Sequence, residues 1–242
     1  MTDLAGISAL ASPNGLFVAG VVPDGDQSIV ILSPAEPEFW PHLKGQPEYS
    51  DGQPDPIDRW SVRVIGEMAK ALGGEAVADT NSVATPEGGK AIVKTAVDAF
   101  GKVDVVVNNA GIPAGAPIED VDYGDVWQGA LDVMLTGMTL TIRAALGHLR
   151  ASSAGRIVNV SSTEGVGGSP STSAYTAAKH GVVGLTRALA VELGETGITV
   201  NAVGPGPIDT GMTAGIPEEA KVKFARRRVP ARRYAEPEEV AH

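Results

Sequence analysis

The sequence predicts an α/β protein built on a doubly wound parallel sheet, and three observations indicate this fold class. From residue 74 onward, short apolar runs alternate with longer segments of helical periodicity, as in β-α-β units. The run Val103–Val107 is apolar except for Asp104, which is typical of a strand covered by helices on both faces. The chain has 242 residues, of which 43% are apolar and 20% charged, so it can bury a full core.

The elements of this alternation follow one another along the chain. Four apolar runs predict the strands, in order "EAVADT", "VDVVV", "RIVNV" and "ITVNAV". Thr85 and Pro86 predict the start of the first helix, because threonine caps helices and proline suits their first turn. A long helix is expected around Trp127 to Leu149, and another from about Ser173 to Leu193.

The first 73 residues have a different pattern. Two short runs, "LFVAGVV" and "SIVIL", are joined by the turn sequence "PDGDQ" and predict a β-hairpin. A proline-rich stretch follows, and then Asp55 and Pro56 open a predicted helix that ends at Gly73. The change in pattern, at residues 72–77, predicts an N-terminal segment over residues 1–73 and an incomplete α/β core over residues 74–242.

Composition excludes several kinds of site. The chain has no cysteine, which excludes disulfides, thiolate nucleophiles and sulfur-ligated clusters or zinc sites, and its four histidines show no metal-ligand spacing. The sequence contains no run of 18 apolar residues, and no basic residue precedes the first apolar stretch. We therefore expect a cytoplasmic protein with no metal and no membrane partner.

Charge is unevenly distributed along the chain. The formal net charge of −10 predicts that nucleic acid is not a partner, yet seven of the thirteen residues in 221–233 are Lys or Arg. Three interpretations of this basic run stay open. It is a solvated helix face, which is the commonest case, a clamp for an acidic substrate or cofactor phosphate, or a nucleic-acid contact.

Ser162, Tyr175 and Lys179 form the candidate catalytic group. Tyr175 and Lys179 are four residues apart, one turn of the predicted helix, so they share a face. Ser162 follows the strand "RIVNV", and ligands bind at the carboxyl ends of parallel strands, so this serine can meet the tyrosine there. A neighbouring ammonium favours the phenolate, so we expect a tyrosine pKa lowered toward neutrality. The adjacent Ser161 is the alternative serine.

Two further strand ends complete a pattern. "VDVVVNNAGI" ends in two asparagines and a small-residue turn, and "NAVGPGPIDTGM" ends in a Pro-Gly turn followed by a threonine. Together with a serine thirteen residues before Y-x-x-x-K, these segments resemble the short-chain dehydrogenase/reductase family over about residues 74–242. Residues 74–112 look most like the dehydrogenase part of peroxisomal multifunctional enzymes, and residues 175–241 look more like bacterial reductases.

The resemblance implies a Rossmann-type fold and hydride transfer between a nicotinamide cofactor, NAD or NADP, and a small-molecule alcohol or carbonyl. It implies that Tyr175 is the general acid or base, that Lys179 holds the nicotinamide ribose and lowers the tyrosine pKa, and that Ser162 binds the substrate oxygen. A homo-oligomer is compatible with it. The further residues implied at the cofactor are Asn108, which also braces the sheet, Ala110, Gly111, Pro205, Gly206, Ile208 and Thr210, with Asp79 or Asn81 at the adenine edge.

Glu164, two residues after Ser162, has two interpretations. We interpret it as a solvated loop residue, with a contact to the substrate as the alternative. The tryptophans Trp40, Trp60 and Trp127 are interpreted as packing residues.

The N-terminal segment departs from the family pattern. Family members open with a strand, a T-G-x-x-x-G-x-G turn and a helix whose amino end holds the pyrophosphate through backbone N–H groups. The glycines of residues 1–73 never fall at that spacing. Residues 13–73 instead faintly resemble part of a bacterial ferredoxin-like family, although without cysteine they cannot bind its cluster through thiolates. A fusion of two coding pieces near Gly73 would explain the change.

Two more departures lie in the core and at its end. Met134 stands where the family usually has an asparagine that supports a water chain to the active-site lysine, and a thioether cannot replace the hydrogen bonds of an amide. The chain stops at "EPEEVAH", before the family's last helix, last strand and V-D-G-G tail. We expect an edge strand and a subunit contact to be missing.

Three functions follow from this combination of motifs and departures. The first is an NAD(P)-dependent oxidoreductase, with either full or impaired activity. The second is a fused or truncated relative that acts as a binding or assembly module without catalysis. The third assigns the function to the N-terminal segment, as an electron-transfer partner or a cobalamin-handling protein.

Overall fold

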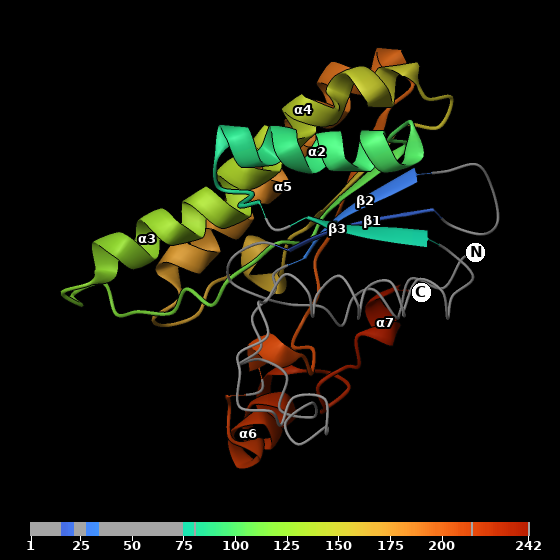
Figure 1. The fold of residues 1–242 in the computed structure, drawn as a ribbon. Coiled ribbons are helices and arrows are strands. Elements are labelled where there is room, and N and C mark those ends of the chain that lie inside the picture. The colour runs from blue at the N-terminus through green and yellow to red at the C-terminus, as the bar shows by residue number, and fades with distance from the viewer. Residues whose placement is uncertain (1–15, 22–27, 34–74, 80, 214, 242) are drawn as a thin grey trace, which may run out of the picture.

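A computed structural model describes residues 16–21, 28–33, 75–79, 81–213 and 215–241 (Figure 1). Six strands form one sheet in the order β3-β1-β2-β4-β5-β6. The sequence predicted every strand to within a few residues. The strands are β1 (Leu16–Val21), β2 (Ser28–Ser33), β3 (Glu75–Asp79), β4 (Val105–Asn108), β5 (Arg156–Val160) and β6 (Thr199–Val203).

The predicted hairpin is confirmed, and it belongs to the main sheet. β1 pairs with β2 antiparallel, from Leu16 opposite Ser33 to Val21 opposite Ser28, and its other edge pairs antiparallel with β3. β2 in turn pairs parallel with β4. The antiparallel direction of β1 is the one that a hairpin requires, and the predicted parallel sheet is present from β2 through β4 and β5 to β6. The hairpin and the strands after residue 74 share this one sheet. The turn at 22–27 and the helix predicted for 55–73 lie outside the described residues.

The parallel half of the sheet positions the site. β4, β5 and β6 pair parallel in register, with Asn108 opposite Asn159 and Val160 opposite Val203. Parallel strands end at the same edge, so the segments after β4, β5 and β6 all emerge at one side of the sheet. The motif residues that follow these strands are thereby brought together.

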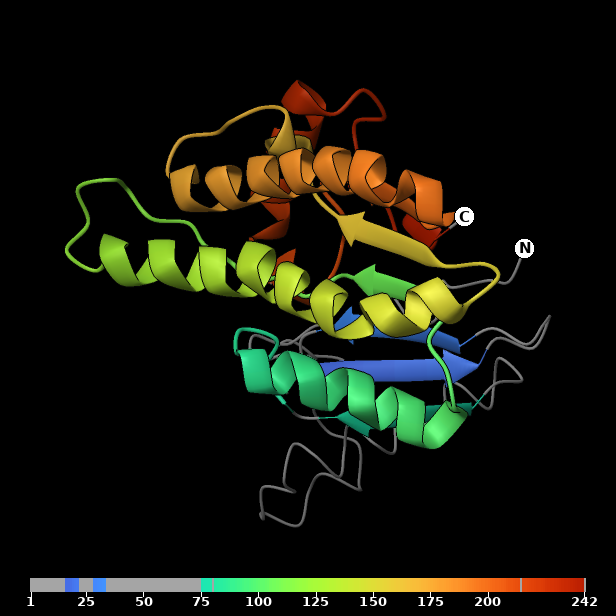
Figure 2. The ribbon, with the colours of Figure 1, turned by 90° about the horizontal axis from the view of Figure 1, so that it is seen from above.

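Helices α2, α4 and α5 cover one face of the sheet, side by side when seen from above (Figure 2). α2 (Pro86–Phe100) begins as predicted: the Thr85 hydroxyl accepts a hydrogen bond from the Gly88 N–H, and Pro86 takes the first turn. The long predicted helix is continuous but contains a π-helical turn, so it consists of α3 (Tyr123–Leu131), η4 (Asp132–Thr136) and α4 (Gly137–Ala151). α5 (Ser173–Leu193) has the predicted bounds.

The main core lies between these helices and the sheet. It contains apolar side chains that are at most 6% exposed, among them Ile92 of α2, Val106 of β4, Ile142 and Leu149 of α4, and Ile157 of β5. The run Tyr123–Ala151 is apolar and long enough for a membrane span by composition alone, with mean hydropathy 1.2. Its α4 half packs into this core, as the central helix of an α/β fold does.

A second, smaller core joins η4 to α5. Met134, Ala174 and Ala178 are buried there, with Tyr175 packed against them. The two elements approach closely at Gly181, where a Cβ would lie 2.6 Å from Leu135 Cδ2. Glycine at this position lets α5 lie against the π-helical turn, which fixes the first turns of α5 beside the loop that follows β4.

The C-terminal part lies beyond the opposite face of the sheet from α2, α4 and α5 (Figure 1). It contains η7 (Gly211–Thr213), α6 (Glu218–Arg228) and α7 (Glu238–Ala241). Asp209 N–H donates to the Ala235 carbonyl at 2.8 Å, and Lys221 Nζ lies 2.7 Å from Asp209 Oδ1. These contacts tie α6 to the loop after β6.

Candidate active site

The loop after β5 places two serines in different roles. Ser161 N–H donates to the Val203 carbonyl at 2.7 Å, and Thr163 N–H donates to the Pro205 carbonyl at 2.9 Å, so this loop is tied to the one after β6. Ser161 is buried, and its hydroxyl donates to the Lys179 carbonyl at 3.1 Å. Ser162 is half-buried, and its Oγ accepts the Glu164 N–H at 3.1 Å. Ser162 therefore keeps its own proton for another partner.

Tyr175 and Lys179 lie in the first turns of α5, as predicted from their spacing. Lys179 is 4% exposed, and its Nζ donates to the Val160 carbonyl at 2.8 Å. The same Nζ lies 5.6 Å from the centroid of the Tyr175 ring. The lysine thus links α5 to the end of β5 while lying beside the tyrosine, and Ser162 follows Val160 by two residues.

Burial sets the protonation of this pair. Burial is the largest effect on Tyr175 and raises its pKa, a side-chain hydrogen bond with Ser162 lowers it, and the charge of Glu164 raises it. Burial alone lowers the pKa of Lys179 to about 8. The expectation of a phenol pKa near neutrality is wrong for this structure, because the lysine directs its ammonium to a carbonyl and desolvation dominates at the phenol.

Asn108 braces the sheet, as the resemblance implied. Its Nδ2 donates to Asn159 Oδ1 at 2.8 Å, and Asn159 Nδ2 donates to Thr186 Oγ1 of α5 at 3.0 Å. Among the described residues, Asn108 Oδ1 is the buried side-chain oxygen that has no hydrogen-bond partner. Sequence analysis missed Asn159 and Thr186, although an asparagine in the apolar run "RIVNV" was the available signal.

The turn after β4 leaves room beside Gly111. Ala110 and Gly111 are both buried. A Cβ on Gly111 would lie 3.6 Å from Met212 Cε and 3.8 Å from Met134 Sδ. The asparagine turn, the π-helical turn and the loop after β6 therefore converge at Gly111, where a side chain would take up the space between them.

The loop after β6 carries the second group of expected cofactor residues. Gly206 is exposed, and a Cβ built on it would meet nothing within 4 Å. Thr213 organises the next turn: its Oγ1 lies 2.9 Å from the Ile208 carbonyl and accepts the Thr210 N–H at 3.0 Å. Pro205 accepts from the β5 loop. Pro205, Ile208 and Thr210 thus lie on a segment whose backbone is fixed on both sides.

Asp79 uses both carboxylate oxygens within the chain. Oδ1 accepts from the backbone and side-chain nitrogens of Asn81 at 2.8 and 2.7 Å, and Oδ2 accepts from Thr95 at 2.5 Å. β3 is also an edge strand, and β1 and β2 separate it from β4. Asp79 and Asn81 hold the entry to α2 in this structure, and their role at an adenine edge stays a prediction.

Met134 is fully buried at the centre of the π-helical turn. It packs with Ala130, Ala174 and Ala178, and Tyr175 lies against this cluster. π-helical turns inside helices are rare and frequently occur at functional sites. In this chain the thioether joins η4 to α5 by apolar contact, at the place where the family usually has an amide.

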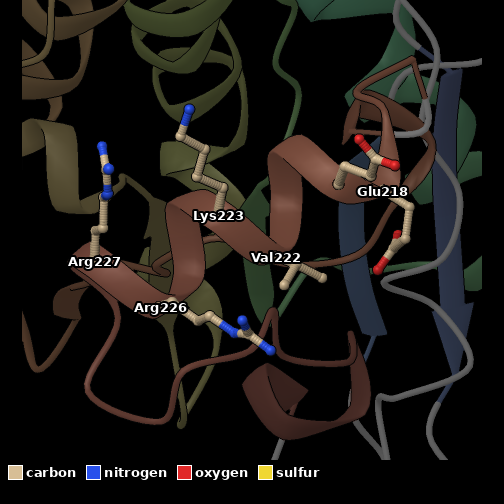
Figure 3. A pocket seen from close by; sticks show the side chains of 6 residues that line it. Glu218, Val222, Lys223, Arg226 and Arg227 are labelled. Carbon is tan, nitrogen blue, oxygen red and sulfur yellow. The ribbon is translucent and has the colours of Figure 1, made fainter.

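Two side chains of the basic run 221–233 form ion pairs with other described residues. Lys221 is paired with Asp209, and Arg233 is paired with Glu239. Lys223, Arg226 and Arg227 project from α6 and, with Glu218, Glu219 and Val222, line a shallow hollow of about 400 Å³ (Figure 3). Lys223 and Arg227 extend from one side of α6 and Arg226 from another, so the three do not meet at one centre, which favours a solvated helix face over a phosphate clamp.

Comparison with known proteins decides the family. The sequence model described as enoyl-(acyl carrier protein) reductase matches residues 58–242. A 3-oxoacyl-[acyl-carrier-protein] reductase of Synechocystis is 41% identical over 178 residues, which cover 74% of this chain and 70% of that protein. The chain belongs to the short-chain dehydrogenase/reductase family. The matched region begins before residue 74, so the family resemblance extends further toward the N-terminus than predicted.

Other members differ in what they act on. A 3-alpha-(or 20-beta)-hydroxysteroid dehydrogenase of Mycobacterium tuberculosis is 43% identical over 161 residues, 64% of this chain and 61% of that protein. The solved structure of a provisionally assigned short-chain alcohol dehydrogenase from Sinorhizobium meliloti aligns with a TM-score of 0.68 and 31% identity, over 74% of each chain. The α/β Rossmann-like fold is thereby established.

Met134→Asn should lower the free energy of unfolding by about 1 to 3 kcal/mol, because it buries an amide where the described neighbours are apolar. Denaturant unfolding measures the loss. Met134→Leu is the control, since it keeps an apolar side chain of similar volume and should cost less than about 1.5 kcal/mol. Unchanged stability together with faster turnover in Met134→Asn would instead indicate that water reaches this position and that the amide restores a proton relay.

Lys179→Met should remove the pH-dependent loss of folding stability that comes from burying a charged ammonium. The pKa of Lys179 is about 8 in the folded chain and ordinarily 10.5, so the unfolded chain binds more protons between these values and wild-type stability rises with pH across this window. The gap between the two pKa values corresponds to about 3 kcal/mol.

Denaturant unfolding at pH 7 and near pH 10.5 measures this effect. The stability advantage of Lys179→Met over wild type should be largest at pH 7 and shrink by about 3 kcal/mol by pH 10.5. Lys223→Met, at an exposed lysine of α6, should follow the wild-type pH dependence. A difference between Lys179→Met and wild type that stays constant with pH would contradict the buried-ammonium interpretation.

Proposed function

We propose that the chain catalyses hydride transfer between a nicotinamide cofactor, NAD or NADP, and a small secondary alcohol or the corresponding ketone. The observation that carries this proposal is the convergence of Ser162, Tyr175 and Lys179 at the end of β5 and the start of α5. The names of the related proteins support the substrate class, because they include a 3-oxoacyl reductase and hydroxysteroid dehydrogenases. A small-molecule substrate and a cytoplasmic location remain part of the proposal.

The described residues fit a nicotinamide cofactor at the carboxyl edge of β4 to β6. Asn108 Oδ1 is a buried acceptor without a partner among the described residues, and the glycine at 111 leaves a space that a side chain would fill. Lys179 has three N–H donors, and one of them is directed at the Val160 carbonyl. Lys179, Asn108, Gly111 and the segment Pro205–Thr210 would hold the cofactor, which supplies or accepts the hydride when bound.

The side chains of the site would handle the proton and the substrate oxygen. In the reducing direction the carbonyl oxygen gains negative charge, and the Tyr175 hydroxyl gives it a proton while the Ser162 hydroxyl donates a hydrogen bond to it. The Glu164 N–H donates to Ser162 Oγ, which leaves the serine proton free for the substrate. The Tyr175 phenolate is then reprotonated from solvent.

Protonation favours the reducing direction at neutral pH. Burial raises the pKa of Tyr175, so the tyrosine is the neutral proton donor that reduction requires. Oxidation of an alcohol needs the phenolate and should accelerate as the pH rises toward the tyrosine pKa. Lys179, whose pKa is about 8, also loses its positive charge in that alkaline range.

Tyr175→Phe should lower kcat by about 10²- to 10⁴-fold, the range for removing a general acid, and leave cofactor affinity nearly unchanged. A spectrophotometric assay of nicotinamide oxidation with small ketones measures the rate. Tyr234→Phe is the control, because it removes the same hydroxyl in the C-terminal part, away from Ser162 and Lys179. This variant should retain activity. Equal turnover of Tyr175→Phe and wild type would remove Tyr175 from the mechanism.

Titration with NADH and NADPH tests the cofactor itself, by quenching of tryptophan fluorescence and by calorimetry. Residues 1–73 carry no glycine turn of the family kind, so two charge-assisted hydrogen bonds to the pyrophosphate could be lost, at about 1.5 to 3 kcal/mol each. We therefore expect salt-sensitive binding with Kd in the range of hundreds of micromolar or weaker. Binding without turnover would favour the binding-module alternative, and no binding would sink the proposal.

A further inference from the structure

Glu164 is not the solvated loop residue that its sequence position suggested. It is half-buried, and its carboxylate accepts hydrogen bonds from Ser169 Oγ at 2.7 Å and Thr176 Oγ1 at 3.0 Å, with Thr172 Oγ1 at 3.5 Å. Three hydroxyls from two segments thus surround one carboxylate. The donors at ordinary hydrogen-bond distance are Ser169 and Thr176, whereas the Thr172 hydroxyl also donates to the Ser169 carbonyl at 2.8 Å.

These contacts connect the serine loop to the tyrosine helix. Glu164 belongs to the short helix η5 (Thr163–Gly165), which is capped by Ser162. Thr172 precedes the first residue of α5, and Thr176 follows Tyr175 directly. The carboxylate therefore lies at the amino end of α5, where the helix dipole favours a negative charge.

We propose that Glu164 is a positioning residue for the catalytic pair: its carboxylate fixes the loop of Ser162 against the first turn of α5 and places a negative charge near the Tyr175 phenol. The inference rests on the proposed role of Tyr175 as proton donor. Burial is the largest effect that raises the pKa of Tyr175, and the charge of Glu164 adds to it, because a negative charge near a phenol opposes formation of the phenolate.

Other titratable groups on the elements around Tyr175 have partners of their own or are exposed. Lys179 lies beside the ring, but its ammonium donates to the Val160 carbonyl. Asp125 of α3 is exposed. The remaining groups and their partners are Tyr123 with Ser173, Asp132 with Gln128, His180 with the Thr176 carbonyl, and Asp209 with Lys221.

The test is the titration of Tyr175 in the full chain labelled with ¹³Cζ-tyrosine, followed by NMR. The chain has four tyrosines, and the signal lost in Tyr175→Phe assigns the one of interest. Glu164→Gln should move the titration of Tyr175 to lower pH, because the amide keeps the size of the side chain and removes its charge. Glu164→Asp keeps the charge, so Tyr175 should titrate closer to its wild-type pH than in Glu164→Gln. Glu192→Gln changes an exposed glutamate of α5, the helix that carries Tyr175, and should leave the titration of Tyr175 unchanged.

Activity provides the second measurement. In Glu164→Gln the alkaline limit of ketone reduction should move to lower pH in step with the NMR titration, whereas a purely structural role would lower kcat equally at every pH. An unmoved Tyr175 titration in Glu164→Gln overturns the inference. Because the NMR measurement needs no turnover, a shifted titration in a chain without reductase activity would leave the inference intact and count against the proposed function alone.

Discussion

A chain of buried amide hydrogen bonds holds the candidate site in place. Asn108 at the end of β4 donates to Asn159 of β5, and Asn159 donates to Thr186 of α5. Apolar packing resists sliding only weakly, because similar side chains can exchange places, but a buried amide that loses its partner costs about 1 to 3 kcal/mol. These two bonds therefore fix the register between two strands and the helix that carries Tyr175 and Lys179. The loop that carries Ser162 is fixed by the same strands, because it starts directly after β5 and is hydrogen-bonded to the end of β6 and the loop that follows it.

Within this frame the chemistry of the site opposes the stability of the fold. Lys179 is buried and Tyr175 is half-buried, and desolvation favours the neutral form of each. The Lys179 ammonium donates to the Val160 carbonyl, and the Tyr175 phenol has a hydrogen bond with Ser162 and feels the charge of Glu164. A site tuned only for stability would carry apolar side chains at both positions. Polar groups around the pair compensate for its desolvation: the Val160 carbonyl accepts from Lys179, and Ser162 hydrogen-bonds with Tyr175.

The sequence predicted the parts of the structure that depend on local pattern. α5 has the bounds expected from its periodicity, and Thr85 caps α2 as its position suggested. Ser162, Tyr175 and Lys179 converge because parallel strands and one helical turn leave little freedom. The misses depend on tertiary context: Asn159 and Thr186 acquire meaning only when their partners are known, and the hydroxyls around Glu164 are brought together by the fold of the loop. The predicted direction of the Tyr175 pKa was wrong for the same reason, because sequence spacing indicates a neighbouring charge but not how deeply the phenol is buried.

The hairpin at the start of the chain explains where a cofactor site departs from the family pattern. In the common order of such sheets, 3-2-1-4-5-6, the strand beside the fourth is the first, and the pyrophosphate is held by the helix that follows it. Here β2 takes that place, and β1 takes the next one but runs antiparallel. Residues 22–27 are too short for the crossover helix that parallel neighbours need, so the antiparallel direction of β1 follows from the length of this connection. The residues that follow Ser33 in the sequence stand where the family has its phosphate-binding turn, and Gly45 and Gly52 are too far apart for a G-x-G turn. The residues proposed for the nicotinamide thus lie on a fixed frame of parallel strands, whereas the sequence that follows β2 lacks the glycine pattern that the family uses for the pyrophosphate.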